Sequence, residues 1–149
     1  MLKIKQFLAL ALAAGVLVSH AADTSPAEPT TSWLTQAQKD IKAKNYTNAI
    51  QTLEAANQTN SADWNNLLGY AQRKKTPPDL AAAERYYQSA LKLDPKHKGA
   101  LEYYGELLLM KNDLAGAEQM LARLDKVCLF SCEEFRDLKE AIARFKGKK

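Results

Sequence analysis

Histidine, cysteine and glycine are scarce in this 149-residue sequence, which contains 2, 2 and 6 of them. A nucleophilic triad needs a histidine base, and His20 lies in an N-terminal segment that we expect to be cleaved off. The other histidine, His97, stands in the lysine-flanked stretch PKHK, where we expect a solvated surface side chain. The sequence also has no glycine-rich phosphate loop and no histidine metal motif. It therefore indicates a protein without catalytic residues or a cofactor.

Long hydrophobic runs are also missing, apart from the apolar residues 7–18 near the N-terminus. Lys3 and Lys5 precede this run, and residues 19–21 follow it with small side chains at the two positions that a signal peptidase reads. As a helix the run would span about 18 Å, too short for a bilayer core of about 30 Å. We therefore predict a cleaved signal peptide over residues 1–21 and export to the periplasm or out of the cell, with no membrane attachment afterwards.

A strong excess of one charge is absent once the signal peptide is removed. The mature chain keeps 19 of the 21 Lys and Arg (21 − 2) against 17 Asp and Glu. The two signs are interspersed and only the tail FKGKK is basic, which does not favour nucleic-acid binding. Residues 22–31 are small, polar and proline-bearing, and predict a flexible leader. The remaining 118 residues (149 − 31) are enough for one domain with a modest core, and we expect a monomer.

A spacing of 34 residues repeats along the mature chain. The segments NYTNAIQTL, PDLAAAERYY and NDLAGAEQML share one layout, in which a small residue is followed four positions later by a large apolar one. Aligned residues are Ala49, Ala83 and Ala117, then Leu53, Tyr87 and Leu121. Small and large residues at this spacing allow close approach of two helices. Such self-similarity is typical of stacked-repeat proteins, whose units bury their apolar faces against their neighbours.

Between these segments the sequence predicts partner helices over residues 33–44, 64–75 and 100–111. Asp94-Pro95 should end the helix that precedes the last of them, because proline removes a donor and clashes with the preceding turn. Gly69 and Gly105 stand inside the predicted helices, and we interpret both as packing contacts. A seventh helix is predicted over residues 131–145, with Ser131 and Glu134 forming a capping box at its start.

The layout resembles the tetratricopeptide repeat, whose 34-residue unit carries W-x2-L-G-x2-Y, then A-x3-F, then a closing proline. The matching positions are Leu68-Gly69, Ala83, Tyr87, Ala90, Pro95, Tyr104-Gly105, Ala117 and Leu121. The resemblance implies an all-α, right-handed superhelix of three helix-turn-helix repeats over residues 32–127, about 32–60, 61–95 and 96–127. A cysteine clip, a capping helix and a basic tail would follow over residues 128–149. The chain also resembles exported bacterial members of this family that carry a cysteine pair after the last repeat.

The two cysteines, Cys128 and Cys132, stand four residues apart in CLFSC. In an exported protein such a pair is most simply a disulfide, and this spacing within a helix separates the Cα atoms by about 6 Å. Here the bond would fix the angle of the capping helix. The alternative is thiol chemistry or copper handling, because Cys132 falls in the first turn of a helix and two thiolates can hold Cu(I). The spacing is not that of the C-x-x-C redox motif.

The resemblance also implies where a partner would bind, because the first helix of each repeat lines a concave groove in this family. The groove positions carried over to this sequence are Asn66, Tyr70, Arg73, Glu102, Tyr103, Glu106 and Met110. Tyrosines would anchor apolar groups of a polypeptide, and the amide would bind its backbone. We therefore expect a non-catalytic protein–protein interaction module that acts as a scaffold for a protein or peptide.

Overall fold

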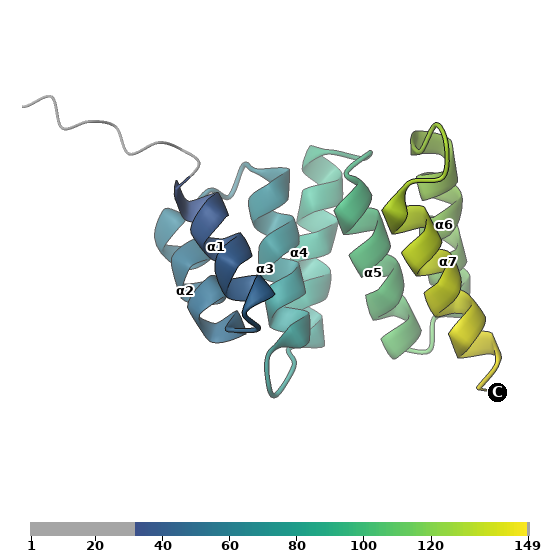
Figure 1. The fold of residues 1–149 in the computed structure, drawn as a ribbon, viewed down its shortest axis with the longest axis horizontal. Helices are drawn as coiled ribbons and strands as arrows, with labels where there is room; N and C mark the ends of the chain where they lie inside the picture. The colour runs from purple at the N-terminus through teal and green to yellow at the C-terminus, as the bar shows by residue number, and fades with distance from the viewer. Residues whose placement is uncertain (1–31, 149) are drawn as a thin grey trace, which may run out of the picture.

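The computed structural model describes residues 32–148, and within this range it contains seven α-helices and no strand (Figure 1). This confirms the prediction of an all-α fold. None of the described helices is both long and apolar enough to span a membrane. The predicted signal peptide (1–21) and leader (22–31) lie outside the described residues. The helices are α1 Ser32–Lys42, α2 Tyr46–Ala56, α3 Ala62–Lys74, α4 Leu80–Leu93, α5 Lys98–Met110, α6 Leu114–Val127 and α7 Glu133–Lys146.

Four of the seven described helices begin at a side chain that caps a free backbone N–H group. Ser61, Asp79 and Asp113 each accept a hydrogen bond from the backbone N–H three residues later. His97 does the same at the start of α5, where its Nδ1 accepts from the N–H of Ala100. The expectation of a solvated His97 was wrong, because the ring is only 14% exposed and its Nε2 lies 3.0 Å from Asp63 Oδ1. This histidine therefore connects the starts of α3 and α5.

The helices form three antiparallel hairpins, α1–α2, α3–α4 and α5–α6, with α7 closing the row (Figure 1). The first helix of each hairpin contacts the first helix of the next, and α5 contacts α7. Among the described helices, α2 makes no comparable contact with α4, nor α4 with α6. Adjacent helices come closest on the inside of a curved stack and separate on its outside. We therefore call the surface of α1, α3, α5 and α7 the inner face, and that of α2, α4 and α6 the outer face.

Both glycines within the predicted helices are packing contacts, as predicted. A Cβ atom on Gly69 would lie 2.7 Å from the ring of Tyr87, which is fully buried in α4. A Cβ atom on Gly105 would lie 2.5 Å from a methyl of Leu138 in α7. Because these glycines have no side chain, the ring of Tyr87 can pack directly against α3, and α7 can pack directly against α5.

The closing helix α7 completes the last hydrophobic cluster with Leu138 and Ile142, which are both buried. The predicted capping box at its start was wrong. Cys132 occupies the N-cap position without a side-chain hydrogen bond to the helix, and Ser131 has a left-handed φ of 43°. In this conformation the chain turns into α7 before Ser131 can cap it. The helix therefore begins at Glu133.

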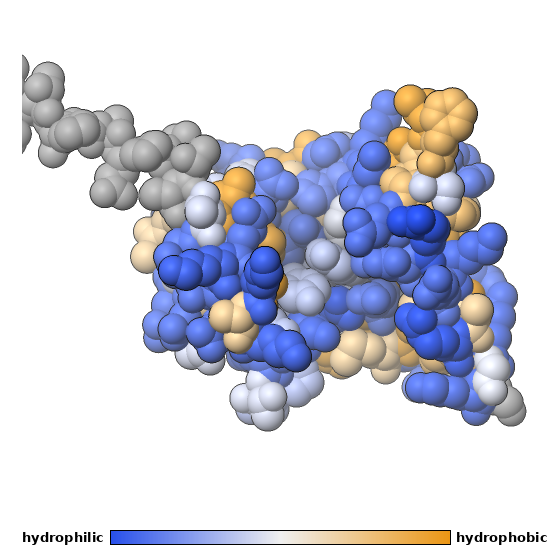
Figure 2. Space-filling view, viewed as in Figure 1, coloured by the Kyte–Doolittle hydropathy of each residue, from blue (hydrophilic) through white to orange (hydrophobic). Residues whose placement is uncertain are grey.

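The turn between α6 and α7 exposes apolar side chains. Leu129 is 88% exposed and Phe130 is 96% exposed. Apolar colour gathers at this end of the α6–α7 hairpin in Figure 2, above a surface that is otherwise mostly hydrophilic in this view. These two residues contribute nothing to the core. They are exposed because they lie in the short turn between the two cysteines.

Candidate functional site

Four of the predicted groove residues meet where α3 and α5 approach each other on the inner face. The ring centroids of Tyr70 and Tyr103 lie 4.7 Å apart. The guanidinium carbon of Arg73 lies 5.5 Å from the Tyr70 centroid and 5.7 Å from the Tyr103 centroid. Arg73 Nη2 also lies 2.6 Å from Glu106 Oε2, which makes an ion pair between the two helices. We call Tyr70, Arg73, Tyr103 and Glu106 the Arg73 cluster.

Arg73 is the centre of this cluster and is only 7% exposed. Burial opposes its charge, but the neighbouring Tyr87 and Glu106 outweigh this effect and raise the pKa of Arg73 above its usual value. Its Nε has no hydrogen-bond partner among the described residues. A guanidinium held by a carboxylate and two aromatic rings has little rotational freedom. The cluster is therefore a rigid, permanently charged feature of the inner face.

The two tyrosines of the cluster stay protonated. Burial is the main cause for both, and it raises the pKa of Tyr70 and that of Tyr103. The next contributions come from Tyr46 for Tyr70 and from Glu102 for Tyr103. Tyr46, the first residue of α2, extends the aromatic row with a centroid distance of 6.3 Å to Tyr70. Tyr46 was not among the groove residues predicted from the sequence. Its place at the start of α2, next to the first helix of the following repeat, was the signal that could have identified it.

Glu102 lies next to the cluster and has no partner. It is 8% exposed and makes no hydrogen bond or ion pair within the described part of the chain. Its pKa is raised from 4.5 to about 8, mainly by burial and then by the carboxylates of Glu106, Asp137 and Glu134, while the charge of Arg73 acts in the opposite direction. At neutral pH this carboxyl group is therefore mostly protonated.

Asn66 stands one turn earlier along the same helical interface and is also buried, at 6% exposure. Its Nδ2 lies over Gly99 in the first turn of α5, where a Cβ atom would approach it to 3.2 Å. Its Oδ1 has no hydrogen-bond partner among the described residues. An unpaired buried carbonyl oxygen is costly, so a donor that paired with this amide would stabilise it.

The last predicted groove residue, Met110, lies apart from the Arg73 cluster. It is the final residue of α5 and is 50% exposed. It borders a cavity of about 240 Å³ between α5 and α7, together with Phe145 and Arg144. The structure therefore brings six of the predicted residues to the α3–α5 interface and leaves the seventh at the far end of α5.

Two acidic residues near this interface were not found from the sequence, namely Glu134 and Asp137 of α7. Both act on the carboxyl group of Glu102 because α7 packs against α5. From the sequence, α7 was predicted only as a capping helix. Its apolar stripe showed which side would be buried but not which polar residues would face Glu102. Glu134 and Asp137 stand three positions apart, which places them on one face of α7.

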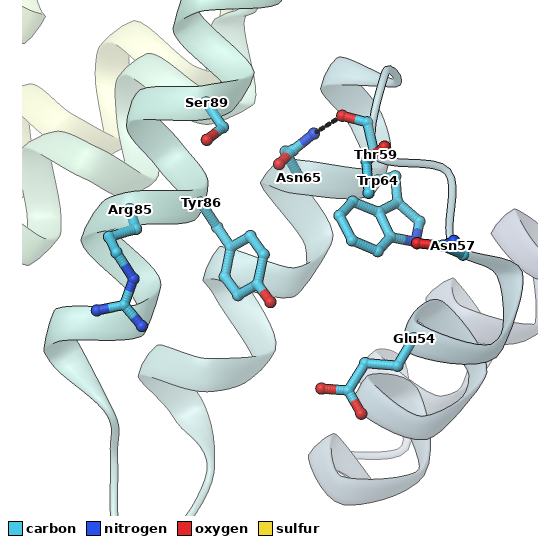
Figure 3. Close-up of a pocket in the computed structure, with 8 residues that line it drawn as sticks. All are labelled: Glu54, Asn57, Thr59, Trp64, Asn65, Arg85, Tyr86 and Ser89. Carbon is cyan, nitrogen blue, oxygen red and sulfur yellow. Dashed lines mark hydrogen bonds between the residues drawn. The ribbon is translucent and has the colours of Figure 1, made fainter.

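A further cavity of about 530 Å³ lies on the outer face between α2 and α4 (Figure 3). Trp64 forms its back, donating from Nε1 to the backbone oxygen of Leu53 at 2.6 Å, with Tyr86 edge-on to it at 6.0 Å. Glu54 and Arg85 enter from α2 and α4 at opposite sides of the space (Figure 3). The cavity therefore lies between α2 and α4, the second helices of the first two hairpins, and it is not part of the predicted groove.

The sulfur atoms of Cys128 and Cys132 lie at disulfide distance, with their Cα atoms 5.5 Å apart. The sulfurs join the end of α6 to the start of α7. Among the described residues no group of three or more His, Cys, Asp and Glu side chains is arranged to hold a metal ion. The arrangement suits a structural clip at the turn into α7.

The comparisons with known proteins concern mainly the fold. The tetratricopeptide repeat family model matches residues 79–128, which cover α4, α5 and α6. No curated protein matches the chain.

Two solved structures of SycD from Yersinia enterocolitica resemble this chain over most of its length. The type III secretion chaperone SycD in complex with a peptide of the translocator YopD is 19% identical, with a TM-score of 0.63 over 78% of this chain and 91% of that chain. The type III secretion translocator chaperone SycD in an alternative dimer is 18% identical, with a TM-score of 0.66 over 80% of this chain and 92% of that chain. Together with the family match, these likenesses confirm the fold class, an all-α superhelix of the tetratricopeptide-repeat type.

Proposed function

We propose that this protein is a non-catalytic interaction module that holds a polypeptide segment of a partner against its inner face. The single observation that carries the proposal is the Arg73 cluster, which places two tyrosines and a buried ion pair across the α3–α5 interface. Tyrosine and arginine are the residue types that contribute most to binding energy in protein interfaces. The cluster therefore has the composition of an interface centre.

The geometry also favours binding through preorganisation. Tyr70 contacts Tyr46 on one side and Tyr103 on the other, and Arg73 is fixed by Glu106. Side chains that are already ordered lose little rotamer entropy when a partner binds. The unpaired Oδ1 of Asn66 adds an acceptor for a backbone N–H of the partner. These features support a segment that anchors through apolar groups and pairs through its backbone.

The comparison with SycD supports the same kind of ligand, because one of the two SycD structures contains a bound peptide. We extend this to the present chain as a proposal only, since the two sequences are 19% identical. We further propose that the protein acts as a monomer in the periplasm or outside the cell. The partner would then be another exported protein.

We also propose that Cys128 and Cys132 are a structural clip and not a thiol-redox or copper site. The supporting observation is the disulfide distance between their sulfur atoms. Thiol labelling of protein taken from the periplasm tests this. We expect complete blocking before a reductant is added and no bound metal, whereas free thiols or stoichiometric copper would favour the alternative.

Site-specific photocrosslinking tests the inner face directly. A photoreactive phenylalanine analogue replaces Tyr70 on the inner face in one variant and Tyr86 on the outer face in the other. Both tyrosines are partly exposed and both make an edge-on ring contact, so the two variants perturb the fold to a similar degree. Thermal melting of both variants checks that they are folded.

We expect a specific crosslinked product from position 70 in cells and none from position 86. A second variant with the same label and Tyr103→Ala should lose that product while keeping its helical circular dichroism. Products that form equally at both positions, or only at position 86, would contradict binding at the inner face.

A further inference from the structure

Glu102 is the feature that the proposed function leaves unexplained. It is a carboxylic acid at 8% exposure with no hydrogen bond or ion pair among the described residues. A buried acid without a partner costs free energy, and the neighbouring Arg73 makes its ion pair with Glu106, at 2.6 Å, and none with Glu102. The folded protein therefore carries an acidic group whose counter-charge is missing.

The charges that face Glu102 are predominantly negative. They come from Glu106 on its own helix, from Glu134 and Asp137 on α7, and from the single cation Arg73 on α3. The helices α5 and α7 are held close by the contact of Leu138 against Gly105, one turn from Glu102. The hydroxyls of Tyr70 and Tyr103 complete the titratable surroundings.

A second buried polar side chain, Asn66, contacts α5 one turn before Glu102. Asn66 directs its Nδ2 at Gly99, which lies three residues before Glu102 on the same face of α5. The Oδ1 of Asn66 lacks a donor among the described residues. The interface therefore offers two hydrogen-bond acceptors without partners, one amide oxygen and one carboxyl group, next to two aromatic rings.

We propose that Glu102, flanked by Glu134 and Asp137, forms a subsite for a lysine or arginine side chain of the bound polypeptide. The cation supplies the missing counter-charge, and its N–H groups can pair with both acceptors. A long aliphatic stem suits the approach past Tyr103, because it packs on the ring while its charged end reaches the carboxylate. This inference rests on the proposed function, since it names what one position of the bound segment must contain.

Binding of the cation is coupled to loss of a proton from Glu102. Burial, with the surrounding carboxylates, holds the pKa of Glu102 at about 8 before a partner binds, and an adjacent positive charge lowers it. The proton leaves to solvent when the ion pair forms. Affinity for a lysine-containing segment should therefore rise as pH increases from 6 to 8, by up to about tenfold per pH unit, and then level off. Lysine stays charged over this whole range.

Selection of random peptides provides the test. A library of displayed peptides is selected at pH 8 on the full mature protein, on Glu102→Gln and on Tyr70→Ala. Gln has the shape of protonated Glu, so the first variant removes the ionisable group with little change in packing. Thermal melting checks both variants. The best wild-type peptide is then compared with a copy in which norleucine replaces its lysine.

We expect wild-type peptides that depend on Tyr70 and share a lysine or arginine at one position. Glu102→Gln and the norleucine peptide should each weaken binding by about tenfold or more, and Glu102→Gln should abolish the pH dependence. Peptides that depend on Tyr70 but lack a basic position, or that bind Glu102→Gln equally well, overturn the subsite and leave the proposed function standing. A failure to select any peptide that depends on Tyr70 overturns both.

Discussion

The ionisation of Glu102 makes the stability of the protein depend on pH in a direction opposite to that of most carboxylates. Its pKa is about 8 in the folded protein against an ordinary value of 4.5. Between these two pH values the folded state holds a proton that the unfolded state has released. The free energy of unfolding therefore falls as pH rises through this window and is constant outside it, as far as this group is concerned.

The size of the effect follows from the same two values. A difference of one proton changes the free energy of unfolding by about 1.4 kcal/mol for each pH unit, so the window from 4.5 to about 8 sets an upper limit of about 5 kcal/mol. Although Glu102 is only 8% exposed as a residue, its carboxyl oxygens are not among the fully buried atoms without a partner, so solvent screens part of this cost. We therefore expect about 2 kcal/mol.

The substitution Glu102→Gln isolates this contribution. At pH 5, near the lower end of this window, the variant and the wild type should differ least in stability, because glutamine resembles the protonated acid. At pH 9 the variant should be more stable by about 2 kcal/mol, because it has no charge to bury. Urea denaturation followed by circular dichroism at pH 5, 7 and 9 measures the difference.

A matched control is available on α7, where Glu140 is 70% exposed and pairs with Arg144. Glu140→Gln should follow the wild type within about 0.5 kcal/mol at every pH. If Glu102→Gln also followed the wild type from pH 5 to pH 9, the carboxyl group would be solvated and ionised in the ordinary range. The argument for a missing counter-charge would then be refuted.

Three other substitutions test the packing that supports the site. Arg73→Met should cost about 3–5 kcal/mol in urea denaturation, because it leaves the partner carboxylate of the ion pair uncompensated; a loss below about 1 kcal/mol would show that the pair is solvated. Gly105→Ala should cost about 1–3 kcal/mol, because the new methyl group meets a buried leucine of α7, whereas Gly147→Ala should be nearly neutral. The double variant Cys128→Ser, Cys132→Ser should lose about 2 kcal/mol and keep its helical circular dichroism; unfolding of the whole chain would contradict a local clip.

Local chemistry was sufficient to predict the helices. The alanines spaced 34 residues apart all lie buried in second helices, and the capping residues Asp79 and Asp113 stand at the same spacing. The break at Asp94-Pro95 separates α4 from α5 as predicted. Each of these features depends on residues within a few positions of one another, which is why the sequence pattern reveals them.

The alignment of the first helices could not be predicted in the same way. Their N-caps Ser61 and His97 stand 36 residues apart, because the turn from α3 to α4 has five residues and the turn from α5 to α6 has three. Counted from the N-caps, Asn66 corresponds to Glu102 and Tyr70 corresponds to Glu106. The strict 34-residue period does not align these pairs.

Seven helices, the pairing of six of them and the residue types along the first helices could all be predicted from the sequence. The ion pair of Arg73 with Glu106, the lack of a partner for Glu102 and the two further carboxylates of α7 became visible only in the folded arrangement. The physical reason is that helix formation depends on near neighbours in the chain. The pairing of side chains depends on the offset and rotation of helices whose contacting residues are about 30 positions apart, and these are set by close packing at positions such as Gly105.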